Sequence, residues 1–279
     1  MFYKKLDRIV EQNNSLLCVG LDSDIKKIHQ NHTNDLTPQF NFNKVVIDAT
    51  HDLVCAYKPN CAFYEARGAD GIKELKMTCD YLRSSYPEIP IILDAKRADI
   101  ENTNEGYVTY AYDYLGVDAI TLHPYVGREA IRPFLDRKEK GCIILCRTTN
   151  SGSEELQGLV VEGRPLYQII AEKVANEWNT NGNCGLVMGA TYPAELGMVR
   201  RIVGDTMLLL VPGIGVQGGD LENILKNGLN SQKKALIINA SRSIIFASNE
   251  PDFAQKIRNE ALRLRDSINV FRIHTYDST

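Results

Sequence analysis

Short apolar runs alternate with amphipathic segments along the whole chain. Eight of these runs have the length and composition of buried strands, and they cover residues 16–22, 54–60, 89–96, 119–124, 141–146, 185–191, 207–213 and 235–241. The segments between them repeat apolar residues at helical spacing, as at Ile169, Ile170, Val174 and Trp178. The strand-like runs are apolar throughout, which is typical of parallel strands that are covered on both faces.

Eight strand–helix units in 279 residues predict an α/β protein with a single (β/α)8 barrel, the TIM barrel, as its only domain over residues 1–279. We expect a helix at about 2–14 before the first strand and a polar tail at about 270–279. A doubly wound open sheet is the alternative. The regular count of strands, and the polar residues at nearly every strand end, favour the barrel.

The active site of a TIM barrel lies at the carboxyl ends of its strands. The third strand ends in Asp94, Lys96 and Asp99, and Asp94 and Lys96 are two residues apart, so they share a face of an extended strand. The other strand ends supply Asp22, Lys58, Asn60, Thr148, Thr149, Pro212, Gly213, Ser241 and Arg242. Each has an ordinary structural explanation, such as a helix cap or a surface lysine, but their convergence on one end of a barrel predicts an active site.

The last two strands are followed by segments that suit a phosphate group. Residues 212–219 read Pro-Gly-Ile-Gly-Val-Gln-Gly-Gly, and residues 239–243 read Asn-Ala-Ser-Arg-Ser. Glycines let backbone N–H groups approach a phosphate, Arg242 can bind it through two hydrogen bonds, and Gln217 can donate another. Tight turns alone would also explain the glycines. The position of both segments after strands seven and eight favours the phosphate site.

Composition narrows the choice of partner. Lys and Arg number 32 and Asp and Glu 35, so the net charge of −3 gives no sign of a nucleic-acid or membrane partner. The seven cysteines form no CxxC pair, which favours reduced thiols in the cytoplasm. Metal-site motifs such as HExxH are missing from the sequence, so we expect no metal.

The segment Asp94-Ala-Lys96-Arg97-Ala-Asp99-Ile100, with Thr103 beyond it, resembles the signature of the orotidine 5′-phosphate decarboxylase family. The resemblance extends along the chain, through Leu21-Asp22, Lys58-Pro-Asn60 and the two phosphate segments. The Lys-Pro-Asn and Cys-Arg-Thr-Thr-Asn segments are similar to the bacterial and protozoan branch of that family. This resemblance implies a TIM-barrel lyase of pyrimidine biosynthesis that converts orotidine 5′-monophosphate to uridine 5′-monophosphate (UMP) and carbon dioxide without a cofactor.

The resemblance also implies roles for particular residues. Lys58, Asp94, Lys96 and Asp99 would form a network of alternating charges, in which Lys96 protonates C6 and Asp94 crowds the substrate carboxylate. The remaining residues would bind substrate: Asp22 and Asn60 at the ribose or ring, Thr148 or Thr149 at the pyrimidine, and Pro212, Gly213, Gln217 and Arg242 at the phosphate.

The family resemblance further implies a homodimer in which Asp99, Ile100 and Thr103 reach the neighbouring subunit's site. Orotate phosphoribosyltransferase, the preceding enzyme of the pathway, is a candidate partner that the sequence alone does not decide. Residues 150–165 are the segment we expect to close over the substrate. Three alternatives remain at this point: a metal-dependent sugar-phosphate epimerase or decarboxylase, a Schiff-base aldolase, and a nucleotide-binding barrel without catalysis.

Overall fold

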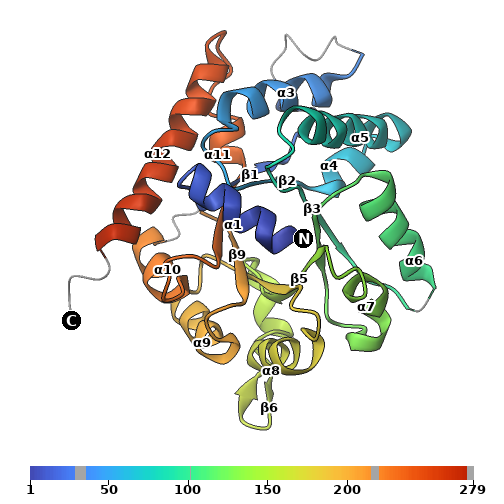
Figure 1. Ribbon diagram of the computed structural model, residues 1–279, viewed down its shortest axis with the longest axis vertical. Helices are drawn as coiled ribbons and strands as arrows, with labels where there is room; N and C mark the ends of the chain where they lie inside the picture. The colour runs from blue at the N-terminus through green and yellow to red at the C-terminus, as the bar shows by residue number, and fades with distance from the viewer. Residues whose placement is uncertain (29–35, 101, 215–219, 275–279) are drawn as a thin grey trace.

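A barrel of parallel strands, surrounded by helices, forms the centre of the computed structural model, which describes residues 1–28, 36–100, 102–214 and 220–274 (Figure 1). The barrel strands are β1 (Leu17–Leu21), β2 (Ala56–Pro59), β3 (Ile92–Arg97), β4 (Ala119–Leu122), β5 (Gly141–Arg147), β8 (Cys184–Met188), β9 (Leu208–Pro212) and β10 (Leu236–Ala240). Each of the eight predicted strands is therefore present, with its ends shifted by up to three residues.

The strands follow the order β2-β1-β10-β9-β8-β5-β4-β3 across one parallel sheet. Two isolated bridges, Tyr57 to Ile91 and Asn60 to Asp94, join the outer strands β2 and β3. These bridges close the sheet into a barrel, so the predicted TIM barrel is confirmed and the open sheet is excluded.

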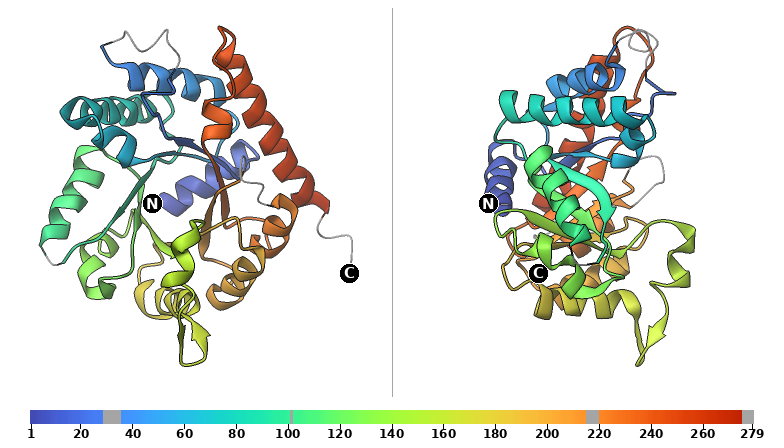
Figure 2. Two further views of the ribbon diagram at one scale, coloured as in Figure 1. Left: turned by 180° about the vertical axis from the view of Figure 1, so that it is seen from behind. Right: turned by 90° about the vertical axis from the view of Figure 1, so that its right-hand side faces the viewer.

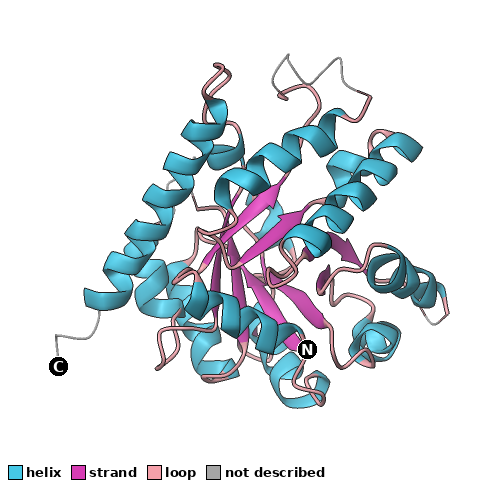
Figure 3. Ribbon diagram, turned by 45° about the horizontal axis from the view of Figure 1, so that its top comes forward, coloured by secondary structure: helices cyan, strands magenta, loops and turns pink. Residues whose placement is uncertain are grey.

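Helices cover the outside of the barrel (Figure 3). They are α1 (Phe2–Gln12), α3 (Pro38–Thr50), α4 (Cys61–Glu65), α5 (Gly68–Ser85), α6 (Thr103–Val108), α7 (Gly127–Leu135), α8 (Leu166–Lys173), α9 (Pro193–Val203), α10 (Leu221–Gly228), α11 (Arg242–Ile245) and α12 (Phe253–His274). Two π-helical stretches, Thr109–Tyr114 and Val174–Trp178, continue α6 and α8. The last helix extends to His274 and so includes the first residues of the segment expected as a polar tail from about 270.

The connection from β5 to α8 contains structure that the sequence pattern did not predict. A short 3₁₀ helix, Ser151–Glu155, is followed by a hairpin of β6 (Val160–Val161) and β7 (Arg164–Pro165). Glu162 and Gly163 form its turn with φ angles of 51° and 77°, the left-handed pair that a two-residue hairpin turn requires. The hairpin projects away from the barrel (Figure 2).

Helix α1 crosses the amino-terminal end of the barrel, which faces the viewer in Figure 1. Its buried residues are Phe2, Leu6, Ile9 and Val10, which recur at helical spacing on one face. Polar contacts fix it in place, because the Tyr3 hydroxyl donates to the Cys184 carbonyl at 2.6 Å. The opposite end of the barrel is therefore the one left open for a ligand.

In the described ranges, no helix combines the length and the apolar character needed to cross a membrane. All seven cysteines are buried and unpaired.

Candidate active site

The end of β3 departs from a regular strand where its charged residues begin. The register against β4 shifts between Leu93 and Arg97, which marks a β-bulge, and Lys96 has a φ of 47°. A left-handed lysine costs roughly 1–2 kcal/mol. The Thr121 hydroxyl of β4 holds the bulge by accepting hydrogen bonds from the backbone N–H groups of Ala95 and Lys96, at 3.1 and 2.9 Å.

Asp94 lies between two lysine ammonium groups. Its Oδ2 is 2.7 Å from the Nζ of Lys58, and its Oδ1 is 2.6 Å from the Nζ of Lys96. The Thr121 hydroxyl donates a third hydrogen bond to Oδ1 at 2.9 Å. The prediction that Lys58, Asp94 and Lys96 lie together is thus confirmed, although a bulge brings Lys96 and Asp94 together where a regular strand was expected.

The two lysines differ in their access to water. The Lys58 side chain is 4% exposed, whereas that of Lys96 is 47% exposed and extends into the open end of the barrel. Burial by itself would raise the pKa of Asp94, but the Lys58 and Lys96 ammonium groups outweigh burial and hold that pKa well below its usual range. Burial would likewise lower the pKa of Lys58, and the nearby carboxylates Asp94 and Asp22 raise it instead. The site therefore holds a buried carboxylate and a buried ammonium, both ionised, beside a more exposed lysine.

Two adjoining cavities open around this network. The first, about 240 Å³, is lined by Asp22, Lys58, Asp94, Thr149, Pro212, Gly213, Ile214, Asn239, Ser241, Arg242 and Ser243. The second, about 400 Å³, is lined by Lys58, Asp94, Lys96, Thr121, Leu145, Thr148, Thr149, Asn150, Gln157, Val187, Leu210 and Pro212. Because four residues line both, the two cavities form one elongated site with the charge network between its halves.

Two hydrogen-bond acceptors at the first cavity receive no hydrogen bond from the described residues. The Oδ1 atoms of Asp22 and Asn239 are buried and make no hydrogen bond within the described part of the chain. A buried acceptor that lacks a donor is costly, so both atoms suit the hydroxyl groups of a ligand. Asp22 was predicted, whereas Asn239 was noted only as part of the phosphate segment.

The same cavity carries the predicted phosphate-binding residues at its far side. Arg242 is the first residue of α11 and is exposed, and its guanidinium has no ion-pair or hydrogen-bond partner among the described residues. Gly213 has a φ of 102°, a conformation that glycine adopts far more readily than any other residue. Gln217, predicted beside them, lies outside the described residues.

Thr148 and Thr149 are both at the site but face different neighbours. The Thr148 hydroxyl donates to Asn150 at 2.6 Å and accepts from the Gln157 amide at 2.8 Å. Thr149 lines both cavities, and among the described residues its hydroxyl makes no hydrogen bond. Thr149 is thus the threonine whose hydroxyl is available to a ligand.

Four predicted residues do not line these cavities. Asn60 caps α4, where its Oδ1 accepts the N–H of Ala62 at 3.1 Å. Asp99 lies on the loop after β3 and accepts the N–H of Ile100 at 2.7 Å. Ile100 is 61% exposed, and Thr103 begins α6 at the surface. Within one chain, Asp99 is therefore apart from the other three members of the predicted network.

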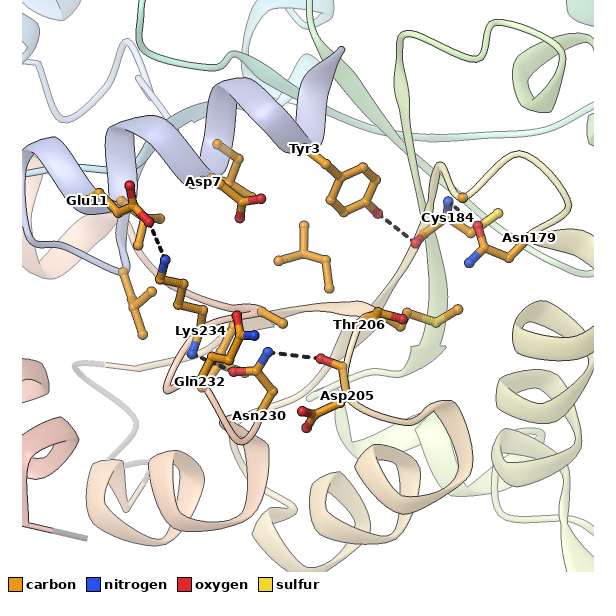
Figure 4. A pocket seen from close by; sticks show the side chains of 18 residues that line it. Tyr3, Asp7, Glu11, Asn179, Cys184, Asp205, Thr206, Asn230, Gln232 and Lys234 are labelled. Carbon is orange, nitrogen blue, oxygen red and sulfur yellow. Dashed lines mark hydrogen bonds and ion pairs between the residues drawn. The ribbon is translucent and has the colours of Figure 1, made fainter. Parts of the chain in front are cut away.

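A further cavity lies at the amino-terminal end of the barrel, between α1 and the turns that precede β9 and β10 (Figure 4). Its volume is about 460 Å³, and its polar rim includes Asp7, Glu11, Asp205 and Lys234. Glu11 and Lys234 form an ion pair across the rim. The charge network lies at the other end of the barrel, so this cavity is not the candidate active site. Nowhere in the described ranges do His, Cys, Asp and Glu residues cluster in a way that could hold a metal ion.

The closed (β/α)8 barrel carries at its carboxyl end a Lys–Asp–Lys network and an arginine without a partner among the described residues. These features place it with barrel enzymes that act on small phosphorylated substrates. Comparison with known proteins identifies the family. Residues 15–257 match the model of the orotidine 5′-phosphate decarboxylase / HUMPS family, and the chain belongs to that family.

Named relatives agree with this assignment. The orotidine 5′-phosphate decarboxylase of Cellvibrio japonicus is 47% identical over 273 residues, which cover 97% of this chain and 99% of the relative. That of a Janthinobacterium strain is 46% identical over 268 residues, covering 96% and 98%. The predicted family, and with it the predicted decarboxylase activity, are confirmed.

Solved structures agree as well. The Leishmania donovani OMP decarboxylase superimposes with a TM-score of 0.84 at 37% identity, covering 97% of this chain and 98% of the other. The Leishmania donovani UMP synthase superimposes with a TM-score of 0.86 at 38% identity, covering 98% of this chain but 57% of the other.

Proposed function

We propose that this chain removes carbon dioxide from orotidine 5′-monophosphate in pyrimidine biosynthesis, with Lys96 as the proton donor to C6 of the ring. The observation that carries the proposal is the position of Asp94, which is held between the ammonium groups of Lys58 and Lys96 at 2.7 and 2.6 Å. The named relatives and the family model support the substrate.

The chemical step follows from the charges. The bond between C6 and the carboxylate carbon breaks, its electron pair remains on C6, and carbon dioxide leaves. The ring has no electron sink for this pair, so a fixed ammonium beside C6 stabilises it and then transfers a proton to it. Both lysines line the larger cavity, and Lys96 suits this task because its side chain is the more exposed of the two. The neutral Lys96 amine then regains a proton from water.

Asp94 and Lys58 have supporting roles in this proposal. Asp94 is ionised and buried, so a substrate carboxylate placed next to it is repelled, and this repulsion is relieved as carbon dioxide departs. Lys58 is the buried counter-ion that holds Asp94 in place.

The remaining predicted residues bind the rest of the nucleotide. The Oδ1 of Asp22, which has no hydrogen-bond partner among the described residues, would accept a hydrogen bond from a ribose hydroxyl. Thr149 would contact the pyrimidine, and Arg242, at the first turn of α11, would bind the phosphate together with Gly213 and the loop that follows it.

We also propose that the active form is a homodimer in the cytoplasm. The proposal is supported by exposed apolar side chains on two adjacent connections, since Ile100 is 61% and Tyr125 is 87% exposed. In a dimer, Asp99 and Thr103 would complete the partner's site. The seven unpaired cysteines favour a reducing compartment.

Association with orotate phosphoribosyltransferase is a third part of the proposal. It is supported by the UMP synthase of Leishmania donovani, in which a chain of this kind makes up only part of a longer protein.

The test is to add orotidine 5′-monophosphate to the purified protein and to follow the loss of pyrimidine absorbance, with and without a chelator. We expect equal turnover in both arms and none in the Lys96→Ala variant, whose circular dichroism should match that of the wild type. Turnover that stops with chelator would instead indicate a metal-dependent enzyme, and near-normal turnover by Lys96→Ala would exclude Lys96 as the proton donor.

A further inference from the structure

Arg147 is the last residue of β5 and directly precedes Thr148 and Thr149 in the candidate active site. Its side chain is fully buried, at 0% exposure. A buried guanidinium is costly unless all of its charge and hydrogen-bonding capacity is matched, and such a group is often replaced by apolar residues without loss of stability. Its presence beside the site therefore calls for an explanation other than packing.

The contacts of Arg147 join the connections that follow two neighbouring strands, β5 and β8. Its Nε donates to Oε2 of Glu195, on the first turn of α9, at 2.6 Å. Its Nη2 is 3.0 Å from Oε2 of Glu154, and its Nη1 donates to the Ser153 hydroxyl at 3.1 Å. The guanidinium also lies over the ring of Tyr192, 4.1 Å from the ring centre. Arg147 thus ties the 3₁₀ helix after β5 to the start of α9.

A second tie fixes the same segment at its other end. Gln157 accepts the backbone N–H of Thr148 at 2.8 Å, and its amide donates to the Thr148 hydroxyl. Residues 148–157 therefore form a loop that is closed by Gln157 and anchored by Arg147. Thr148, Asn150 and Gln157 of this loop line the larger cavity.

The loop also touches the start of the phosphate segment. A Cβ atom built on Gly213 would lie 3.1 Å from the Thr149 methyl group, and one built on Gly189 would lie 2.8 Å from it. The Gly189 N–H in turn donates to the Arg147 carbonyl at 2.7 Å. Thr149 therefore lies between two glycines, one of which is bonded to the backbone of Arg147, two residues before Thr149.

We propose that Arg147 is a positioning residue for the decarboxylation, with Glu195 as its anchor. Its guanidinium holds residues 148–157 as a preformed wall of the substrate cavity and holds Thr149 against Gly213, so that the ring-binding and phosphate-binding halves keep a fixed spacing. This inference rests on the proposed function for the identity of the substrate. Misplacing such a wall by about 1 Å can cost on the order of a hundredfold in rate.

The test compares Arg147→Met, Arg147→Lys and Glu195→Gln with a matched control, Arg164→Met. Arg164 lies in the same β5–α8 connection and pairs with Glu172 at 2.8 Å, but it is exposed and outside both cavities. For each variant, kcat and KM with orotidine 5′-monophosphate, the dissociation constant for UMP and the melting temperature are measured.

We expect Arg147→Met and Glu195→Gln to remain folded, with kcat/KM lowered about tenfold to a hundredfold and UMP binding weakened. Arg147→Lys keeps the charge but loses the planar fork, so it should recover only part of the loss. The control should stay within about twofold of the wild type.

A purely structural role would lower the melting temperature while leaving kcat/KM per folded molecule unchanged, and that result in either Arg147→Met or Glu195→Gln would overturn the proposal. If Arg147→Met does not fold, Glu195→Gln decides the matter, because it removes the anchor and leaves the buried residue in place. A wild-type protein that binds UMP but does not consume the substrate would refute the proposed function alone, and the UMP affinities of the variants would still test the positioning role.

Discussion

Replacing Asp94 with asparagine is the most direct test of the charge network. Asparagine keeps the shape of the side chain and can still accept the Thr121 hydrogen bond, but it removes the negative charge between Lys58 and Lys96. The two lysines should respond differently. Lys96 is 47% exposed and can turn toward water, so losing its pair costs less than about 1 kcal/mol.

Lys58 cannot make this adjustment, because its side chain is 4% exposed and its partner oxygen is 2.7 Å away. Leaving one member of a buried ion pair without its partner costs about 3–5 kcal/mol. We therefore expect the free energy of unfolding of Asp94→Asn to fall by about that amount. In a chain of this size, the melting temperature should fall by roughly 6–20 °C.

Urea denaturation and thermal scans followed by circular dichroism measure this loss. Asp48→Asn is the control, since Asp48 accepts hydrogen bonds from Lys44 at 2.7 Å and Tyr86 at 2.9 Å but has a side chain that is 39% exposed. We expect the control to lose less than about 1 kcal/mol. An Asp94→Asn variant as stable as the wild type would refute the reasoning, because it would mean that Asp94 does not stabilise the charge of Lys58.

Four further outcomes are expected. Arg242→Ala should weaken UMP binding about tenfold to a hundredfold and leave the affinity for the nucleoside uridine unchanged; equal effects on both ligands would exclude a phosphate contact. The pKa of Asp94 is lower in the folded state than in the unfolded chain, so its contribution to the free energy of unfolding is complete above about pH 4 and is lost as the pH falls further. The difference in stability between wild type and Asp94→Asn should therefore narrow as urea titrations are made more acid. A constant difference from about pH 6 to pH 3 would contradict this. Mixing inactive Asp99→Ala with inactive Lys96→Ala subunits should restore turnover in hybrid dimers, and no recovery after verified subunit exchange would argue against shared sites. Gly213→Ala should raise KM, because alanine is strained at a φ of 102° and its Cβ would press on Thr149; an unchanged KM would show that this turn tolerates a side chain.

The parts of the site that could be predicted from sequence are those that follow from topology. Parallel strands of one barrel bring their carboxyl ends together, so Lys58, Asp94 and Lys96 could be placed at one opening without coordinates. The proximity of Asp94 and Lys96 was also predicted, but for a different reason: residues two apart on a regular extended strand point to the same face. The bulge and the left-handed Lys96 were not predictable, because they depend on the Thr121 hydroxyl of the neighbouring strand.

The residues that sequence reasoning missed lie inside apolar strands or beside recognised motifs. Thr121 and Asn239 are polar residues that interrupt the apolar sequences of β4 (Ala119–Leu122) and β10 (Leu236–Ala240), and this is the signal that could have drawn attention to them. Arg147 precedes the threonine pair that was singled out, but an arginine at a strand end is usually exposed. Its complete burial follows from α9 and from the connection after β5, whose packing against β5 the hydrophobic pattern does not encode.

The closure of the barrel between β2 and β3 gives the charge network a second, mechanical importance. The other neighbouring strands are paired over several residues, with register shifts between β3 and β4 and between β5 and β8. In the described chain, β2 and β3 are instead joined by isolated bridges at Tyr57–Ile91 and Asn60–Asp94. The Lys58–Asp94 ion pair also joins β2 to β3, so it helps to hold the barrel closed. If β2 and β3 moved apart, the Lys58 and Asp94 charges would separate, and a ligand that competes for the Asp94 carboxylate would weaken the contact between these two strands. The same ion pair therefore contributes both to the geometry of the reacting charges and to the closure of the barrel.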